Sequence, residues 1–247
     1  MLLLFDTSTR TAVVALGDGT GETVLGERVY PVTSGGSAQL LTGALGLLTD
    51  QGAGLEDLTG VVVDRGPGSY TGLRIGYALA QGLAETRGIP LAGVPSFEAF
   101  AMTHREDHRA LIVCFEARSR GIAWVTFPKG SDRTEGVGEE PVLRPGERQH
   151  EILEWEGQRS LVRFAPPDAL PGLIPRPCRA VGPGVDRLSS TLNTEPHNDL
   201  ELVTGTGYPE VAALLRAGAR RLERGGEDPA RVEPLYLGTM EPPARGV

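Results

Sequence analysis

The chain has 247 residues, 40% of them hydrophobic, which is enough for one large domain or two of ordinary size. Its net charge of −8 argues against a protein that binds nucleic acid without a partner, because contacts with phosphate groups require a basic face. The two cysteines lack metal-type spacing and favour a reduced, cytoplasmic protein. We expect neither a signal peptide nor a membrane partner, since no basic n-region and no long apolar run is seen.

The chain opens on an apolar strand that ends in a carboxylate. Residues 2–6 (LLLFD) precede a polar turn at 7–11 and a second strand at 12–16. The same order returns at 111–116 (LIVCFE), followed by a short turn and a strand at 122–127. Two such hairpins, one in each half of the chain, predict a duplicated α/β fold.

Two helical patterns follow the first hairpin. Apolar residues in 37–48 form two neighbouring stripes, together wider than one core-facing side needs. Residues 71–87 have an apolar face and a row of small residues at i, i+4 spacing, which lets another helix approach closely. Either both faces are buried within one domain, or the excess surface is an interface with another chain. The interface candidates are Leu41, Leu45, Leu48, Gly72, Ile75, Gly76, Leu79, Ala80 and Leu83.

A glycine-rich segment, DRGPGSYTGLR (64–74), joins a valine-rich strand to the second helix. A strand, glycine turn and helix start in this order can present backbone N–H groups to an anion. The composition of 66–69 predicts a type II turn with positive φ at Gly68, and Ser69 or Thr71 is the expected N-cap. The alternative is a tight connection that binds nothing. The candidates for ligand or anion binding, here and in the first hairpin, are Asp6, Thr7, Ser8, Arg65, Gly66, Gly68, Ser69 and Arg74.

The second half of the sequence is less regular. Residues 128–205 are rich in proline, glycine and charge, and we interpret them as variable surface loops. Residues 207–224 predict an amphipathic helix that packs back on the sheet. We expect an N-terminal subdomain at 1–105 with the interface helices, a C-terminal subdomain at 106–206, and a helix and tail at 207–240.

Three motifs carry a family resemblance. RGPGSYTGLRIG (65–76), with FDTST (5–9) and PLYL (234–237), resembles the TsaB (YeaZ) family of bacterial tRNA threonylcarbamoyladenosine (t6A) biosynthesis proteins. The resemblance implies an α/β, duplicated actin/sugar kinase/Hsp70-like (ribonuclease H-like) fold with two subdomains. It also implies a cytoplasmic, non-catalytic subunit of the complex that transfers a threonylcarbamoyl group to adenosine 37 of tRNA.

The resemblance implies partners as well. In the TsaB family the two helices are the surface that pairs with a second copy or with TsaD, the catalytic relative. We therefore expect a homodimer when the chain is alone, and a TsaD-type subunit with a TsaE-type ATPase in the working complex. Contact with tRNA would come only through that complex. The isolated chain needs no cofactor, whereas ATP and Mg²⁺ would enter with the complex.

The resemblance also locates a metal site that this sequence lacks. TsaD carries a His-x-x-x-His pair where this chain has Ser96 and Phe100, and neither side chain replaces an imidazole. His104 and His108 repeat the spacing, but no third ligand is evident beside them. We therefore predict no metal and no catalytic residue in this chain.

Two other functions stay open at this point. One is an ATP-dependent carbamoyl or phosphoryl transferase that uses Asp6 and the 65–74 loop. The other is a metallopeptidase, which the older glycoprotease label of the superfamily suggests. Two positions depart from the TsaB pattern, because Gly36 stands where histidine is usual and Glu116 where aspartate is usual.

Overall fold

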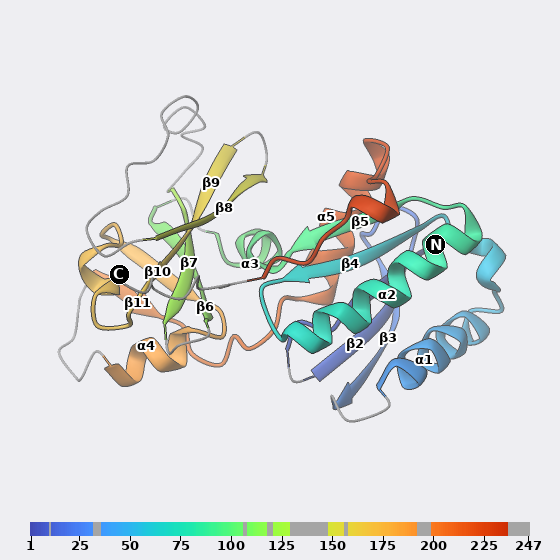
Figure 1. Ribbon diagram of the computed structural model, residues 1–247, viewed down its shortest axis with the longest axis horizontal. Helices are drawn as coiled ribbons and strands as arrows, with labels where there is room; N and C mark the ends of the chain where they lie inside the picture. Colours follow the sequence, from blue (N-terminus) through green and yellow to red (C-terminus); the bar gives the residue numbers. More distant parts are fainter. Residues whose placement is uncertain are drawn as a thin grey trace, which may run out of the picture. The chain divides into compact units, whose positions relative to one another are not determined.

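The computed structural model divides into two compact units, each with its own sheet (Figure 1). Unit 1 holds Met1–His104 and Tyr208–Leu235, and unit 2 holds Arg105–Gly207 and continues from Tyr236. The structure describes residues 1–9, 11–31, 36–105, 108–117, 121–128, 148–155, 158–191 and 199–236. Leu237, the last residue of the PLYL motif, lies outside these ranges.

Unit 1 is built on a five-stranded sheet in the order β3-β2-β1-β4-β5. Its strands are β1 (Leu2–Asp6), β2 (Thr11–Gly17), β3 (Val24–Pro31), β4 (Gly60–Gly66) and β5 (Leu91–Pro95). The first three strands pair antiparallel, while β1, β4 and β5 run parallel. The carboxyl ends of β1 and β4 therefore meet at one edge of the sheet.

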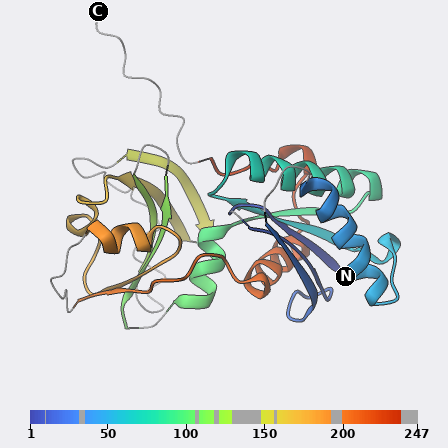
Figure 2. The same cartoon turned by 90° about the horizontal axis from the view of Figure 1, so that it is seen from below.

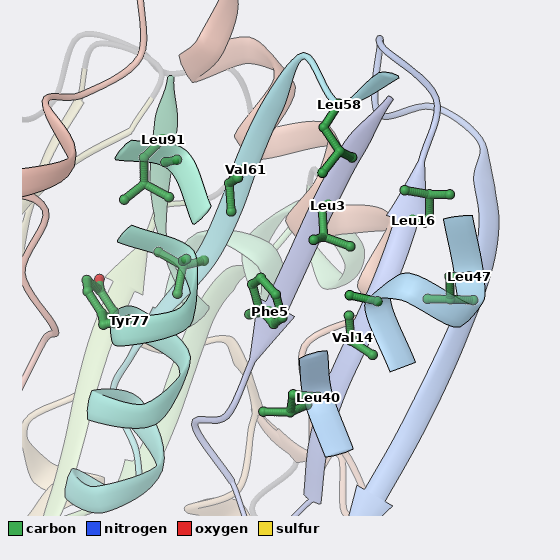
Figure 3. Packing of buried hydrophobic residues seen from close by; sticks show 14 of the residues in the cluster. Leu3, Phe5, Val14, Leu16, Leu40, Leu47, Leu58, Val61, Tyr77 and Leu91 are labelled. Carbon is green, nitrogen blue, oxygen red and sulfur yellow. The ribbon is translucent and has the colours of Figure 1, made fainter. Parts of the chain in front are cut away.

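Helices cover both faces of this sheet (Figure 2). They are α1 (Gly36–Asp50), α2 (Tyr70–Arg87), α3 (Ser96–His104) and α5 (Val211–Glu223), with 3₁₀ turns η1 (Leu55–Asp57) and η4 (Pro229–Arg231). Leu3 and Phe5 point into the core beneath α1 and α2 (Figure 3), whereas Leu2 and Leu4 pack with α5 on the other face. Burial on both faces explains why β1 is a continuous apolar run.

The glycine turn between β4 and α2 differs from the predicted type II turn. Positive φ occurs at Gly66 (+86°) and not at Gly68, and the Gly66–Pro67 peptide is cis. The Gly66 N–H donates a hydrogen bond to the Asp64 carboxylate at 2.8 Å, and the chain bends at this point. Of the two predicted N-cap candidates, Ser69 and Thr71, Ser69 is the N-cap of α2, and its Oγ accepts from the Gly72 N–H at 3.2 Å.

Unit 2 has a six-stranded sheet in the order β11-β10-β6-β7-β9-β8. Its elements are β6 (Ala110–Glu116), β7 (Ile122–Phe127), β8 (Arg148–Trp155), β9 (Gln158–Ala165), η3 (Leu170–Gly172), β10 (Cys178–Val181), α4 (Val185–Thr191) and β11 (Leu200–Leu202). The interpretation of 128–205 as loops is wrong for much of this region, since it contains the β8–β9 hairpin and the β10-α4-β11 unit. Both strands of the hairpin are broken by charged residues, so no long apolar run marks them.

The two sheets repeat one plan. In each, a first antiparallel hairpin (β1–β2, β6–β7) is extended on one side by two parallel strands. A Gly-Pro-Gly turn follows the first of these strands in both units, with positive φ at Gly66 and at Gly182 (+99°). The predicted duplication is confirmed, although sequence reasoning missed the second Gly-Pro-Gly turn.

Helix α5 packs back on the sheet of unit 1, as predicted. Leu214 and Leu215 are fully buried, and Gly218 lies against Val62 of β4. Two arginines of α5 form ion pairs within the unit. Arg221 contacts Glu98, and Arg216 lies 3.0 Å from Glu22. No helix in the described part of the chain is both long enough and apolar enough to cross a membrane.

Candidate functional site

The turn after β1 and the glycine turn after β4 touch at the edge of the unit 1 sheet. The Ser69 N–H donates to the Ser8 carbonyl oxygen at 2.6 Å. Asp6, Thr7 and Ser8 are almost completely buried. A Cβ atom at position 68 would overlap the Ser8 carbonyl, so Gly68 is required by the close approach of the two turns.

Three backbone N–H groups of the glycine turn donate to acceptors inside the fold. Gly66 donates to Asp64, Ser69 to Ser8, and Gly72 to the Ser69 hydroxyl. An anion cradle needs such N–H groups to point outward. This arrangement favours the tight connection over the phosphate site, and ligand binding by the candidates stays an untested prediction. Arg65 lies at one end of the turn, where its Nε donates to the Glu233 carbonyl at 2.9 Å.

The row of small residues on α2 faces its own unit. Gly72, Gly76 and Ala80 are buried. A Cβ atom at Gly72 would overlap the Thr7 carbonyl oxygen, and one at Gly76 would overlap the Thr7 hydroxyl. The prediction that this row approaches a helix of another chain is therefore wrong, because Thr7 occupies that space. The row instead lets α2 lie close to the end of β1.

A buried pair of carboxyl groups joins β1 to β4. The Ser8 N–H and hydroxyl donate to Asp6 Oδ1 at 2.9 and 2.7 Å, and the Ser96 hydroxyl lies 2.7 and 2.8 Å from the two Asp64 oxygens. Asp6 and Asp64 also hydrogen-bond each other. Burial raises the pKa of both groups, and the Asp6 charge raises the pKa of Asp64 further, well above its ordinary value. The two carboxyl groups therefore titrate as one pair.

Sequence reasoning singled out Asp6 but missed Asp64. A signal existed, because an aspartate follows the apolar run of each of two strands and parallel neighbours end at the same edge. Glu116, the counterpart of Asp6 in unit 2, is exposed, whereas Asp6 is buried. The two hairpins therefore end in carboxyl groups with different surroundings.

The residues at the expected metal position do not fit a metal ion. Ser96 is buried and bonded to Asp64, while Phe100 lies in the core with the His104 ring stacked on it at 6.0 Å. His108 accepts a hydrogen bond from Arg109 at 3.1 Å. Among the described residues, no group of three His, Cys, Asp or Glu side chains is placed to hold a metal ion.

An exposed apolar face remains on α1 and α2. Leu41 and Leu45, one turn apart on α1, are each 43% exposed, and Tyr70 at the start of α2 is 44% exposed. On α2 there is an open groove of about 470 Å³. We call the following residues the docking face: Leu41, Leu45, Tyr70, Thr71, Arg74, Ile75, Ala78 and Leu79.

Arg74 is the charged side chain in this groove. Its guanidinium lies 5.5 Å from the centre of the Tyr70 ring and donates to the Tyr70 hydroxyl at 3.2 Å. The interface candidates Ile75, Leu79 and Leu83 are half-buried and touch the core with one side. Leu48 is only 1% exposed, so it belongs to the core and not to the docking face.

Comparisons with known proteins place the chain in a family. The model of the family described as "TsaD: tRNA N6-adenosine threonylcarbamoyltransferase" matches residues 34–200, which is more than half of the chain. Curated relatives share the name "tRNA threonylcarbamoyladenosine biosynthesis protein TsaB". The chain belongs to the family that this model describes, and within it to the TsaB (YeaZ) proteins.

The TsaB relatives match in part of their length. The protein of Bacillus subtilis is 36% identical over 117 residues, 47% of this chain and 50% of its own. That of Escherichia coli is 31% identical over 159 residues, 62% of this chain and 66% of its own. The alignments thus span half to two thirds of these relatives.

A solved structure extends the likeness to the whole fold. YeaZ from Pseudomonas aeruginosa superposes with a TM-score of 0.66 at 22% identity, over 96% of this chain and 99% of that chain. This likeness shows the fold, and it confirms the predicted two-subdomain α/β architecture.

Proposed function

We propose that this TsaB-type chain is a non-catalytic subunit of the machinery that forms t6A in tRNA. It docks through α1 and α2 onto a TsaD-type subunit, which binds the metal and transfers the threonylcarbamoyl group to adenosine 37. A TsaE-type ATPase joins the complex, and ATP with Mg²⁺ enters there. The names of the TsaB relatives and the TsaD family match support a role in t6A biosynthesis.

The observation that carries this proposal is the exposed docking face. Apolar side chains that lie in a groove and along a neighbouring helix are typical of a surface that another protein covers. In the described part of unit 1, Leu40 and Ala44 belong to the core cluster beneath α1, whereas Leu41 and Leu45 do not. The face therefore has apolar area beyond what folding of unit 1 uses.

Other properties of the chain suit a subunit that works through partners. A net charge of −8 makes unaided tRNA binding weak, so we propose that tRNA is held by the complex. When no TsaD-type subunit is present, the same face would pair with a second copy, giving a homodimer. Covering the face in either way removes the exposed leucines from water.

Leu45→Glu tests the docking face directly. A leucine half-covered in the free chain gains further burial on docking, and a glutamate there would have to lose its hydration instead. We expect binding to the TsaD-type subunit to weaken by about 30-fold or more, as for an interface hot spot. Titration calorimetry with the purified partner measures this change.

Val29→Glu is the matched control for this substitution. Val29 is 56% exposed, and it alternates on β3 with Arg28 and Tyr30, which lie against α1, so it faces the other side of the sheet. We expect its affinity to stay within about twofold of wild type, the usual outcome outside an interface. Equal binding by wild type and Leu45→Glu would exclude this face as the docking surface.

A further inference from the structure

The last segment of unit 1 crosses the sheet beside α2. We call residues 227–235 the C-terminal strap; Figure 1 shows it in red alongside β4 and β5. It begins where the Glu227 N–H donates to the Leu91 carbonyl at 2.8 Å and the Glu227 carboxylate accepts from the Gly93 N–H at 3.1 Å. It ends where the Leu235 N–H donates to the Arg65 carbonyl at 2.7 Å. The strap thus links β5 to the glycine turn after β4.

Two side chains of α2 hold the strap. The Gln81 amide donates to the carbonyls of Pro229 and Val232 at 2.7 and 3.2 Å. The Tyr77 hydroxyl donates to the Glu233 carbonyl at 3.0 Å. Tyr77 and Gln81 are four residues apart and so share one flank of the helix. Arg74 and Ala78 of the docking face lie three residues before them, on the adjoining flank.

The strap is anchored by burial as well as by hydrogen bonds. Val232 and Leu235 are 2% and 0% exposed. A Cβ atom at Gly93 would meet a Val232 methyl group and the Arg65 side chain, so only glycine leaves room for both. The Glu233 carbonyl accepts from Arg65 as well as from Tyr77. The Glu233 carbonyl of the strap therefore bonds both to Arg65 in the glycine turn and to Tyr77 on α2.

We infer that the C-terminal strap is a positioning element for docking, which holds α2 in place against the sheet through Tyr77 and Gln81. The inference rests on the proposed function, because α2 forms half of the docking face. It also gives the PLYL motif a role, since Pro234 and Leu235 close the strap. If the strap positions α2 for the partner, the partner must in turn stabilise the strap by the same factor.

The double variant Tyr77→Phe/Gln81→Met tests this role without touching the docking face. It removes the hydrogen bonds to the strap and keeps side chains of similar size. We expect affinity for the TsaD-type subunit to fall about tenfold, because the three hydrogen bonds that are lost are together worth at least that factor. Thr86→Val is the control, because the Thr86 hydroxyl bonds to its own helix at Gly82, and its affinity should stay within about twofold.

Hydrogen exchange of the full chain supplies a readout that a purely structural role would not change. The amides of Glu227 and Leu235 lie off the docking face, yet their exchange should slow about tenfold when the TsaD-type subunit binds. Unchanged exchange at these amides in the complex, or wild-type affinity of the double variant, would overturn the inference while leaving the proposed docking intact. Absence of any complex with wild type would instead refute the proposed function itself, and this inference with it.

Discussion

Gly76→Ala is expected to lower the free energy of unfolding of unit 1 by about 1–3 kcal/mol, the usual cost of overpacking a core. The added methyl group would overlap the Thr7 hydroxyl, which is buried and has no hydrogen-bond partner in the described structure. Thr7→Ala removes that hydroxyl and leaves about a normal contact to the new methyl group. We therefore expect Thr7→Ala to be nearly neutral alone and to restore most of the stability of Gly76→Ala.

Urea unfolding of the four proteins in this cycle measures the coupling between the two positions. Gly82→Ala is the internal control on the same helix, because a Cβ atom there meets nothing within 4 Å. It should stabilise the chain by about 0.5–1 kcal/mol, as alanine usually does in place of a helical glycine. Additive effects of Thr7→Ala and Gly76→Ala would contradict the packing of α2 on the end of β1.

Asp64→Asn is expected to make the chain more stable at neutral pH and to flatten the pH dependence of its stability. The folded-state pKa of Asp64 is raised by burial and by the Asp6 charge, so the native state retains a proton that the unfolded chain releases. The protonated Asp64 side chain therefore contributes to the stability of the folded state. This contribution is fully present below the ordinary pKa of 3.8 and is lost as the pH rises from there through the raised pKa. Asparagine keeps the hydrogen bonds of the protonated acid and needs no proton.

The advantage of Asp64→Asn over wild type should therefore grow with pH, by up to about 1.4 kcal/mol per pH unit for one proton. Denaturant unfolding at several pH values between 4 and 8 follows this difference. The groups facing Asp64 are Asp6 on β1, Ser96 on α3 and Tyr77 on α2. Asp6 should respond together with Asp64, because the two titrate as one pair.

Asp18→Asn serves as a control of opposite sign. The side chain and backbone of Thr20 donate to the exposed Asp18 carboxylate, which lowers its pKa. Any stability that Asp18 contributes is present above its ordinary pKa and is lost as the pH falls. A variant at Asp64 that followed the same course as Asp18→Asn, or a wild-type chain whose advantage grew with pH, would argue against a raised pKa at Asp64.

Local patterns in the sequence predicted much of unit 1. The hairpin at 2–16, the helices over 37–48 and 71–87, and the cap at Ser69 all follow from signals within a few residues. The docking face was predicted only in part. Periodicity marked two apolar stripes on α1, but it could not say that Leu45 is exposed while Leu48 is buried, because this depends on how the helix is rotated against the sheet.

What sequence reasoning missed depends on contacts between distant segments. Asp64 matters because β1 and β4 are parallel neighbours, and Gly76 because Thr7 lies beneath α2. A row of small residues indicates close approach without saying to what. The strap was visible only as the PLYL motif, since its hydrogen bonds to α2 join residues about 150 positions apart along the chain.

Formation of t6A in a reconstituted system tests whether this chain is a required but non-catalytic subunit. Purified TsaD-type and TsaE-type subunits, tRNA and the threonylcarbamoyl donor would be assayed with no added chain, with wild type, and with Leu45→Glu or its Val29→Glu control. We expect modification with wild type and the control, and little without the chain or with Leu45→Glu. Modification by this chain alone, or full activity of the other components in its absence, would contradict this role.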